Sequence, residues 1–418
     1  MSILIIADDL SGAADCAIGF ASAGHRTVVT LDPSGVGTVD ADVIAADTDT
    51  RRLSPADAAA RVAAAYEKLQ APGRRLYKKI DSTLRGNWAA EVAALQPMAG
   101  LAIVAPAFPA TGRTLRGGRV FVHGGPLEST DTWKLDNLDR PADVQAMLAA
   151  AGLSTALLDV EALRRDPGDL ARRIRTSGAQ ALIVDAETDQ DLLTLARVTS
   201  RMDEALFWVG SGGLAREIAT LADLFHTDVP AVETMHRHEA PILVLVGSLS
   251  AVSERQCAML RERGGVGELI VPPALLRDGA RHPEWSAWQA RVGATLAART
   301  DLLLRIGRDE AFDPAEGAHL STALAALVEP HFTKTGGLIA TGGETARAML
   351  SAAGIGSLQL LKEIEAGVAV GRPLDAGRVH RPGIVTKAGA FGTDHALYAA
   401  WLHLSDAVEP DAISPLTR

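Results

Sequence analysis

Short runs of consecutive apolar residues alternate with longer segments of helical periodicity along most of the chain. Residues 3–7 form the first apolar run, the polar turn DDLSG follows, and residues 13–23 have a helical pattern that ends at Gly24. Strands are predicted in the same way at residues 27–31, 42–46, 76–80, 101–105, 181–184 and 206–209, with helices at 55–70 and 87–95. Apolar strands that alternate with helices are typical of a parallel sheet covered on both faces.

The pattern breaks once and then restarts. Residues 224–241, LFHTDVPAVETMHRHEAP, contain two prolines and show neither helical nor alternating periodicity, which indicates a domain boundary. A new strand, loop and helix follow at once in ILVLVG and SLSAVSERQCAMLRERGG, and GLIATGGETARAMLSAAG repeats that order later. We therefore predict an α/β protein of two domains with mainly parallel sheets, residues 1–228 and 240–418, and an active-site cleft between them.

Composition narrows the classes of function. The chain has 418 residues, of which 47% are hydrophobic and 22% charged, and its net charge of -10 disfavours nucleic acid or an anionic membrane as a partner. Asp8 and Asp9 interrupt the apolar N-terminal stretch before it could act as a signal sequence, and no apolar run approaches the ~20 residues that span a bilayer. We therefore expect a cytoplasmic protein.

Two loops of the first half carry groups suited to a small hydroxylated acid. Asp8 and Asp9 follow the first strand, and the segment KKIDSTLRGN places Asp81 and Arg85 just after the strand at 76–80, with Lys79 at its end. Ligands of parallel α/β sheets bind outside the carboxyl ends of the strands. Arginine grips a carboxylate in a bidentate fork, lysine adds a point charge, and Asp9 or Asp81 could accept a hydroxyl proton. The alternative is that Asp8, Asp81 and Ser82 only cap helices and that Arg85 is solvated.

The segment GSGGLA, residues 210–215, also follows a strand and opens a helix, as in a dinucleotide-binding turn. No acidic residue ends a second strand ~20 residues later, so close helix packing or an anion contact is the favoured interpretation. No Walker A pattern occurs in the chain, which excludes a P-loop kinase.

Three loops of the second half offer small residues, hydroxyls and backbone N–H groups at predicted strand ends. They are GSLS at 247–250, TGGET at 341–345 and TKAGAFG at 386–392. Each taken singly is typical of a tight turn with a helix cap, but three in one domain favour a nucleotide pocket. Lys387 is the candidate cation for its phosphates.

In these segments the chain resembles the four-carbon acid sugar kinase family, and ADDLSGAAD, KKIDSTLRGN, PAFPATGRT, GSGGLA, GSLS, TGGETA and KAGAFG occur in the family's order. The resemblance implies an N-terminal domain for threonate, erythronate or 3-oxo-tetronate, a C-terminal domain for ATP with Mg²⁺, and phosphorylation of the O4 hydroxyl. Together with the residues above, it gives one candidate set: catalytic Asp9 and Asp81; substrate-binding Asp8, Lys79, Ser82, Arg85 and Gly86; nucleotide-binding Ser248, Ser250, Gly342, Gly343, Glu344, Thr345, Lys387 and Gly389.

Two other functions stay open at the level of the sequence. One is an NAD(P)-dependent oxidoreductase acting on similar acids, and the other is an acid-sugar binding protein that a nucleotide switches. Ser11 and Leu249 stand where the family commonly has Thr and Cys, which leaves the acid and its stereochemistry open. The catalytic base among Asp8, Asp9 and Asp81, the Mg²⁺ ligands and the oligomeric state are also open, and a homodimer is one hypothesis.

Overall fold

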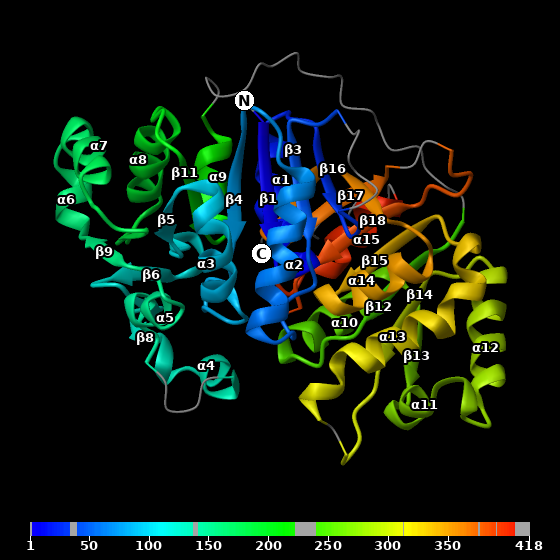
Figure 1. Cartoon of the computed structure of the whole chain (residues 1–418). Coiled ribbons are helices and arrows are strands. Elements are labelled where there is room, and N and C mark those ends of the chain that lie inside the picture. The colour runs from blue at the N-terminus through cyan, green and yellow to red at the C-terminus, as the bar shows by residue number, and fades with distance from the viewer. Residues whose placement is uncertain are drawn as a thin grey trace, which may run out of the picture. The chain divides into compact units, whose positions relative to one another are not determined.

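The computed structural model describes residues 2–33, 40–136, 141–221, 240–311, 313–374, 377–389 and 391–405 (Figure 1). These residues form two compact units. The first contains the described residues up to Leu221 together with Gly356–Leu361, and the second contains the remaining residues from Ala240 onward. The predicted boundary at 224–241 lies almost entirely outside the described residues.

The first unit is built on a sheet in the order β16-β2-β3-β1-β4-β11-β5-β10-β9, in which every pair is parallel except β16 with β2. A small antiparallel sheet, β6-β7-β8, follows β5. The elements of this unit are β1 (Ser2–Ala7), α1 (Leu10–Ser22), β2 (Thr27–Thr30), β3 (Val43–Asp47), α2 (Pro55–Leu69), β4 (Arg74–Lys79), α3 (Trp88–Ala99), β5 (Leu101–Ala105), β6 (Arg113–Arg116), β7 (Arg119–Val122), β8 (Gly125–Pro126), α4 (Asp131–Asp136), α5 (Val144–Ala150), β9 (Thr155–Leu158), α6 (Val160–Arg164), α7 (Pro167–Arg175), β10 (Ala181–Val184), α8 (Asp189–Ser200), β11 (Leu206–Gly210) and α9 (Gly212–Ala219).

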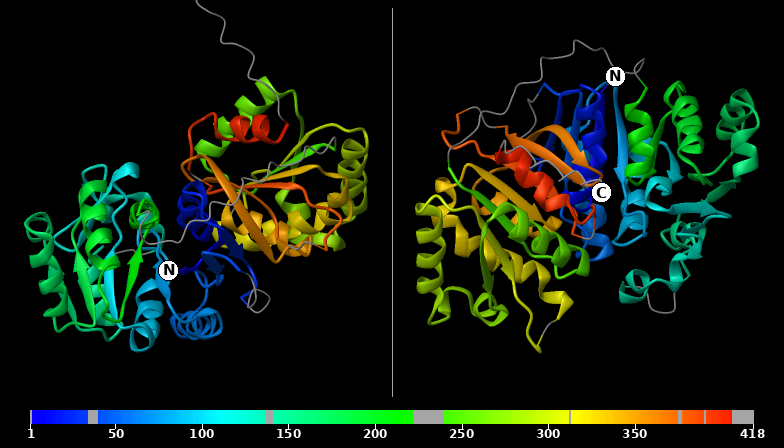
Figure 2. Two further views of the ribbon diagram at one scale, coloured as in Figure 1. Left: turned by 90° about the horizontal axis from the view of Figure 1, so that it is seen from above. Right: turned by 180° about the vertical axis from the view of Figure 1, so that it is seen from behind.

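Strand β1 marks the point where the chain reverses its direction across this sheet. The connection from β1 through α1 leads to β2 on one side, whereas the connection from β3 through α2 passes back over β1 to β4. Right-handed crossovers in opposite directions place their helices on opposite faces of a sheet. Helix α1 accordingly packs with α9 and helix α2 with α3, on the two faces (Figure 2). Such a reversal is where α/β sheets bind ligands.

The second unit has a sheet in the order β13-β14-β12-β15-β18-β17, parallel except for β17 with β18. Its strands β12, β15 and β18 are buried throughout, although β15 ends in Thr341 and β18 in Thr386 and Lys387. The elements are β12 (Ile242–Val246), α10 (Ala251–Gly264), β13 (Gly267–Val271), α11 (Pro273–Asp278), α12 (Trp285–Ala297), β14 (Leu302–Ile306), α13 (Gly317–Val328), β15 (Gly337–Thr341), α14 (Gly343–Ala352), β16 (Ser357–Glu365), β17 (Val368–Pro373), β18 (Gly383–Lys387) and α15 (Ala396–Ser405).

The structure confirms the α/β class and the mainly parallel sheets, with strand bounds within two residues of those predicted for β1, β2, β3, β4, β5, β10 and β11. One arrangement was not foreseen: the first half of β16, Ser357–Leu360, pairs antiparallel with β2 and so adds an edge strand to the first unit. None of the helices described here combines the length and the apolar character that crossing a membrane requires.

Candidate active site

The loops after β1 and β3 meet through Arg51. Its Nε and Nη2 donate to the two oxygens of Asp8 at 2.7 and 3.0 Å, and its Nη1 donates to Asp9 Oδ2 at 2.9 Å. Strands β1 and β3 are neighbours, so their carboxyl ends bring these side chains together. One guanidinium therefore holds both aspartates of the ADDLSG turn.

The two aspartates have different duties. Asp9, not Asp8, is the N-cap of α1, because its Oδ1 accepts a hydrogen bond from the backbone N–H of Gly12 at 2.9 Å. The side chain of Asp8 is 4% exposed and has both oxygens on Arg51, whereas that of Asp9 is 23% exposed. Asp9 therefore keeps acceptor capacity on a partly open carboxylate.

Asp81 lies at the end of the neighbouring strand β4. Its Oδ1 accepts from the backbone N–H and the hydroxyl of Thr83 at 3.0 and 3.1 Å, and its Oδ2 pairs with Arg85 Nε. The side chain of Arg85 is 37% exposed, so this arginine is paired rather than simply solvated. The predicted substrate residues Lys79 and Ser82 are also at this strand end, and both are buried.

The loop 80–87 has an unusual backbone. Leu84 is buried with a φ of +56°, which is rare for a residue other than glycine. Gly86 has a φ of +83°, and a Cβ there would lie 2.9 Å from Asp8 Oδ2. Gly86 therefore lets this loop approach the Asp8–Arg51 pair closely.

The charges of this region keep its carboxylates ionised. Burial raises the pKa of Asp81, but the nearby Arg85, Arg51 and Lys79 outweigh burial and hold this pKa below its usual value. The pKa of Asp8 is lowered in the same way: burial opposes the shift, and Arg51 is the main cause of it. At neutral pH the region therefore presents carboxylates to accept hydroxyl hydrogen bonds beside cations that suit a carboxylate.

In the second unit, the serine loop after β12 is held by its own hydroxyls. Ser250 caps α10 by accepting from the N–H of Ser253 at 3.1 Å, and its hydroxyl also accepts from Ser248 at 3.1 Å. The hydroxyl of Ser253 donates to the carbonyl oxygen of Gly389 at 2.8 Å. This contact joins the first turn of α10 to the loop after β18.

The TGGET segment lies between those two loops, because β15 is the strand between β12 and β18. Gly342 has a φ of +98° and precedes α14 with no side-chain cap, so no side chain of the N-cap residue satisfies the N–H groups of the first turn. Gly343 begins that helix and Glu344 is exposed in its first turn. Thr345 is instead buried, with its hydroxyl 3.1 Å from that of Ser321.

Lys387 ends β18, but its ammonium points into its own loop. It donates to the carbonyl oxygens of Ala388, Gly389 and Phe391 at 2.9, 3.0 and 3.0 Å, and its side chain is buried. All three N–H donors are therefore engaged. In this structure Lys387 therefore organises the KAGAFG loop.

Comparison with known proteins also divides the chain into two parts. A family described as a sugar-binding N-terminal domain matches residues 3–218, and one described as a nucleotide-binding C-terminal domain matches residues 243–397. A protein from Cupriavidus necator named D-threonate kinase is 54% identical over 99% of this chain and 100% of its own length. The chain belongs to the four-carbon acid sugar kinase family.

A second named kinase and a solved structure extend the comparison. A D-threonate kinase from Bordetella bronchiseptica is 35% identical over 95% of this chain and 96% of its own length. A crystal structure from Salmonella typhimurium LT2 matches with a TM-score of 0.79 and 21% identity over 96% of this chain and 98% of that chain, which shows the shared fold.

For a kinase of this family, the GSGGLA turn needs no dinucleotide. A Cβ on Gly210 would lie 2.6 Å from the hydroxyl of Tyr77, and one on Gly212 would lie 2.5 Å from Asp15 Oδ2. Ser211 caps α9 and donates its hydroxyl to the carbonyl oxygen of Ala107 at 2.9 Å. Close packing therefore explains Gly210 and Gly212, and it is one of the two interpretations that the sequence favoured.

Two arginines of the kinase's first unit were missed from the sequence. Arg51 was overlooked although DTDTRR follows an apolar strand in the same way as DDLSG and DSTLRGN do. Arg113, at the start of β6, belongs to the segment PAFPATGRT but was assigned no role. It lies close enough to Asp81 and Arg85 for their charges to act on its pKa, which burial lowers overall. A search for polar residues after every predicted strand would have found Arg51.

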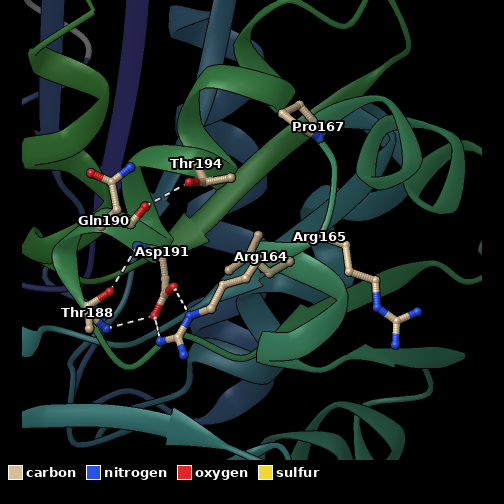
Figure 3. Close-up of a pocket in the computed structure, with 8 residues that line it drawn as sticks. Arg164, Arg165, Pro167, Thr188, Gln190, Asp191 and Thr194 are labelled. Atoms are coloured by element: carbon tan, nitrogen blue, oxygen red, sulfur yellow. Dashed lines mark hydrogen bonds and ion pairs between the residues drawn. The ribbon is translucent and has the colours of Figure 1, made fainter.

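A pocket between α6, α7 and α8 lies at other loops of the first unit (Figure 3). Arg164 donates to both oxygens of Asp191 at 2.7 Å, and Asp191 and Thr188 form a capping box at the start of α8. Arg165 points away from this pair in Figure 3. The polar groups of the pocket thus bond mainly to one another, and none of the predicted site residues lines it.

Proposed function

We propose that this protein transfers the γ-phosphoryl group of ATP to the O4 hydroxyl of D-threonate. The observation that carries the proposal is the 54% identity with a D-threonate kinase over essentially the full length of both chains. Erythronate and 3-oxo-tetronate are the competing acids, because they differ from threonate only in the configuration or oxidation state of one carbon.

The first unit would hold the acid sugar. Arg85 has five N–H donors and uses its Nε on Asp81, so its terminal nitrogens are the donors we assign to the substrate carboxylate, with Lys79 as a second charge. We assign Asp9 to orient the attacking hydroxyl, since it is more exposed than Asp8 or Asp81. A loose phosphoryl-transfer transition state needs such alignment more than it needs a strong base.

The second unit would hold ATP. The hydroxyls of Ser248 and Ser250 and the N–H groups at the start of α14 are suited to phosphate oxygens. No group of three or more His, Cys, Asp or Glu in the described residues could hold a metal. Mg²⁺ bound with ATP takes most of its ligands from phosphates and water, so Glu344 and the serine hydroxyls fit it as occasional protein ligands. When bound, Mg²⁺ neutralises charge on the phosphates.

A coupled assay of ADP release tests the proposal. Purified protein would be given MgATP and, in separate reactions, D- and L-threonate, D- and L-erythronate and the 3-oxo acids. We expect the highest kcat/KM with D-threonate and a product whose ³¹P and ¹³C spectra place the phosphate on O4. ADP release with none of these acids would favour the nucleotide-switched binding protein, and binding of NADH in place of ATP would favour the oxidoreductase.

We further propose that the protein works in the cytoplasm, where ATP is supplied. The homodimer hypothesis is tested by light scattering coupled to size-exclusion chromatography, in which a mass twice the 43.7 kDa of the chain is the expected result.

A further inference from the structure

A fully buried ion pair lies behind the acid-sugar loops of the first unit. Lys78 Nζ is 2.7 Å from Glu91 Oε2, and neither side chain is exposed to solvent. The same ammonium donates to the carbonyl oxygens of Lys79 at 3.1 Å and Ile6 at 3.4 Å. It therefore joins α3, which carries Glu91, to the ends of β1 and β4.

The other oxygen of Glu91 reaches the loop after β3. The hydroxyl of Thr50 donates to Glu91 Oε1 at 2.5 Å and lies 3.0 Å from the hydroxyl of Thr48. The hydroxyl of Thr48 has one proton, which it can donate either to Thr50 or to the carbonyl oxygen of Ala7 at 2.8 Å. In both cases the backbone N–H of Thr48 donates to that carbonyl oxygen at 2.9 Å. Polar contacts therefore lead from α3 to the last residue of β1.

Hydrogen bonds to the backbone of the loop after β3 hold it at two further points. The N–H of Thr50 donates to the carbonyl oxygen of Asp8 at 3.1 Å. The side-chain amide of Asn87 donates to the carbonyl oxygens of Thr50 at 3.1 Å and Leu53 at 2.8 Å. The next residue after Thr50 is Arg51, which holds Asp8 and Asp9, so whatever fixes Thr50 also fixes the arginine that places both aspartates.

Stability alone is a poor reason for this buried pair. Desolvating two charges costs about as much as their attraction returns, and replacing such a pair with apolar residues of similar volume is often neutral or stabilising. Both side chains are fully buried, so neither meets a substrate directly. The remaining role for the Lys78–Glu91 pair is to fix the positions of the residues around it.

We propose that Lys78, Glu91 and Thr50 are positioning residues that set the geometry of Arg51, Asp8 and Asp9 for phosphoryl transfer. The inference rests on the proposed function, because it assigns residues to that reaction. Its physical basis is that a misplacement of about 1 Å in a catalytic arrangement can reduce the rate by about 10²-fold.

Three variants test the network. Thr50→Val removes one hydroxyl without changing the side-chain volume, Glu91→Gln removes one charge, and the double variant Lys78→Met/Glu91→Leu replaces the pair with apolar groups. Kinetics would be measured well below the melting temperature of each variant. We expect kcat/KM for D-threonate to fall by about 10- to 100-fold while KM for ATP stays within twofold, and we expect Thr50→Ser to restore most of the rate.

A matched control and a second measurement separate positioning from folding. Asp191→Asn also neutralises a carboxylate that is 2% exposed and paired with an arginine in the same unit, but at the loops of Figure 3. It should lower the melting temperature without changing either KM. Hydrogen exchange in the peptide that contains Arg51 should accelerate in Thr50→Val and not in Asp191→Asn.

The outcomes distinguish the two proposals. Wild-type protein that phosphorylates none of the acids would refute the proposed function, whereas the exchange measurement needs no substrate and still tests the network. An active wild type whose double variant folds and keeps the wild-type kcat, KM and exchange rates would overturn the positioning role alone.

Discussion

The loops at the strand ends of the first unit are linked mainly by ion pairs between charged side chains. The corresponding loops of the second unit are linked mainly by hydroxyl groups and backbone carbonyl oxygens. In the first unit, Arg51 binds two carboxylates and Arg85 binds a third. In the second, Ser248 and Ser250 bond to each other, and Lys387, a buried cation, turns toward its own loop carbonyls.

This difference matches two kinds of ligand. Phosphates carry their own charge and are held by N–H groups at helix starts, which need no particular side chain. A four-carbon acid has one carboxylate and several similar hydroxyls, so it must be distinguished by directional side chains whose partners are costly to leave unpaired. We therefore expect substitutions in the first unit to change the choice of acid, and those in the second to change ATP affinity only.

The largest expected effect is on the carboxylate that orients the hydroxyl. Asp9→Asn keeps the shape and the helix cap but removes the charge, so kcat should fall by about 10²- to 10⁴-fold with KM for ATP unchanged. Asp81→Asn is the comparison, because its carboxylate is already occupied by Thr83 and Arg85. Steady-state kinetics with saturating MgATP measure both. If Asp81→Asn lost more activity than Asp9→Asn, Asp81 would take the orienting role.

The second largest expected effect is on the guanidinium that we assign to the substrate carboxylate. Arg85→Ala should raise KM for D-threonate by an amount equivalent to roughly 2–5 kcal/mol, since it deletes a charge-assisted pair. Arg85→Lys should recover only part of this loss, because an ammonium lacks the planar fork. Arg173→Ala removes an exposed arginine of α7 that is also paired with an aspartate, and it should leave the kinetics unchanged. An unchanged KM in Arg85→Ala would refute the assignment.

A backbone substitution probes the second unit. Gly342→Ala places a side chain at a φ of +98°, which costs about 1–3 kcal/mol or shifts the start of α14. KM for ATP should rise about tenfold while KM for D-threonate stays constant. Gly279→Ala imposes similar strain at a φ of +56° elsewhere in that unit, where a Cβ meets nothing within 4 Å. If KM for ATP rose equally in both variants, the cause would be general backbone strain and not the position of Gly342.

The smallest effect concerns the buried cation. Burial lowers the pKa of Lys387 to about 8, only partly offset by Cys257 and Glu365. As pH rises through 8, the ammonium loses a proton and one loop hydrogen bond, so KM for ATP should increase about fivefold, the equivalent of about 1 kcal/mol. Stability should move the opposite way: between pH 8 and about 10.5 the unfolded chain binds more protons, so the free energy of unfolding rises with pH. Lys387→Met should abolish both trends, and their persistence in that variant would assign them to another group.

Much of this comparison could be predicted from the sequence. Apolar strands that alternate with helices predicted the mainly parallel sheets. Polar residues directly after predicted strands indicated five of the loops that carry the candidate residues. Arg51 was missed because the segment DTDTRR does not record that β3 lies beside β1, and this pairing brings Arg51 to Asp8 and Asp9. The direction of Lys387 depends on competition between loop carbonyls and a ligand, which no local pattern records. The pairing of β16 with β2 joins segments more than 300 residues apart, and neither segment specifies the other.

The division of labour between the two units is tested most directly by crossed calorimetric titrations. D-threonate and a non-hydrolysable MgATP analogue would each be titrated into wild-type protein, Arg85→Ala and Gly342→Ala. We expect Arg85→Ala to weaken binding of D-threonate alone and Gly342→Ala to weaken binding of the nucleotide analogue alone. Loss of nucleotide binding in Arg85→Ala, with D-threonate binding intact, would contradict the account.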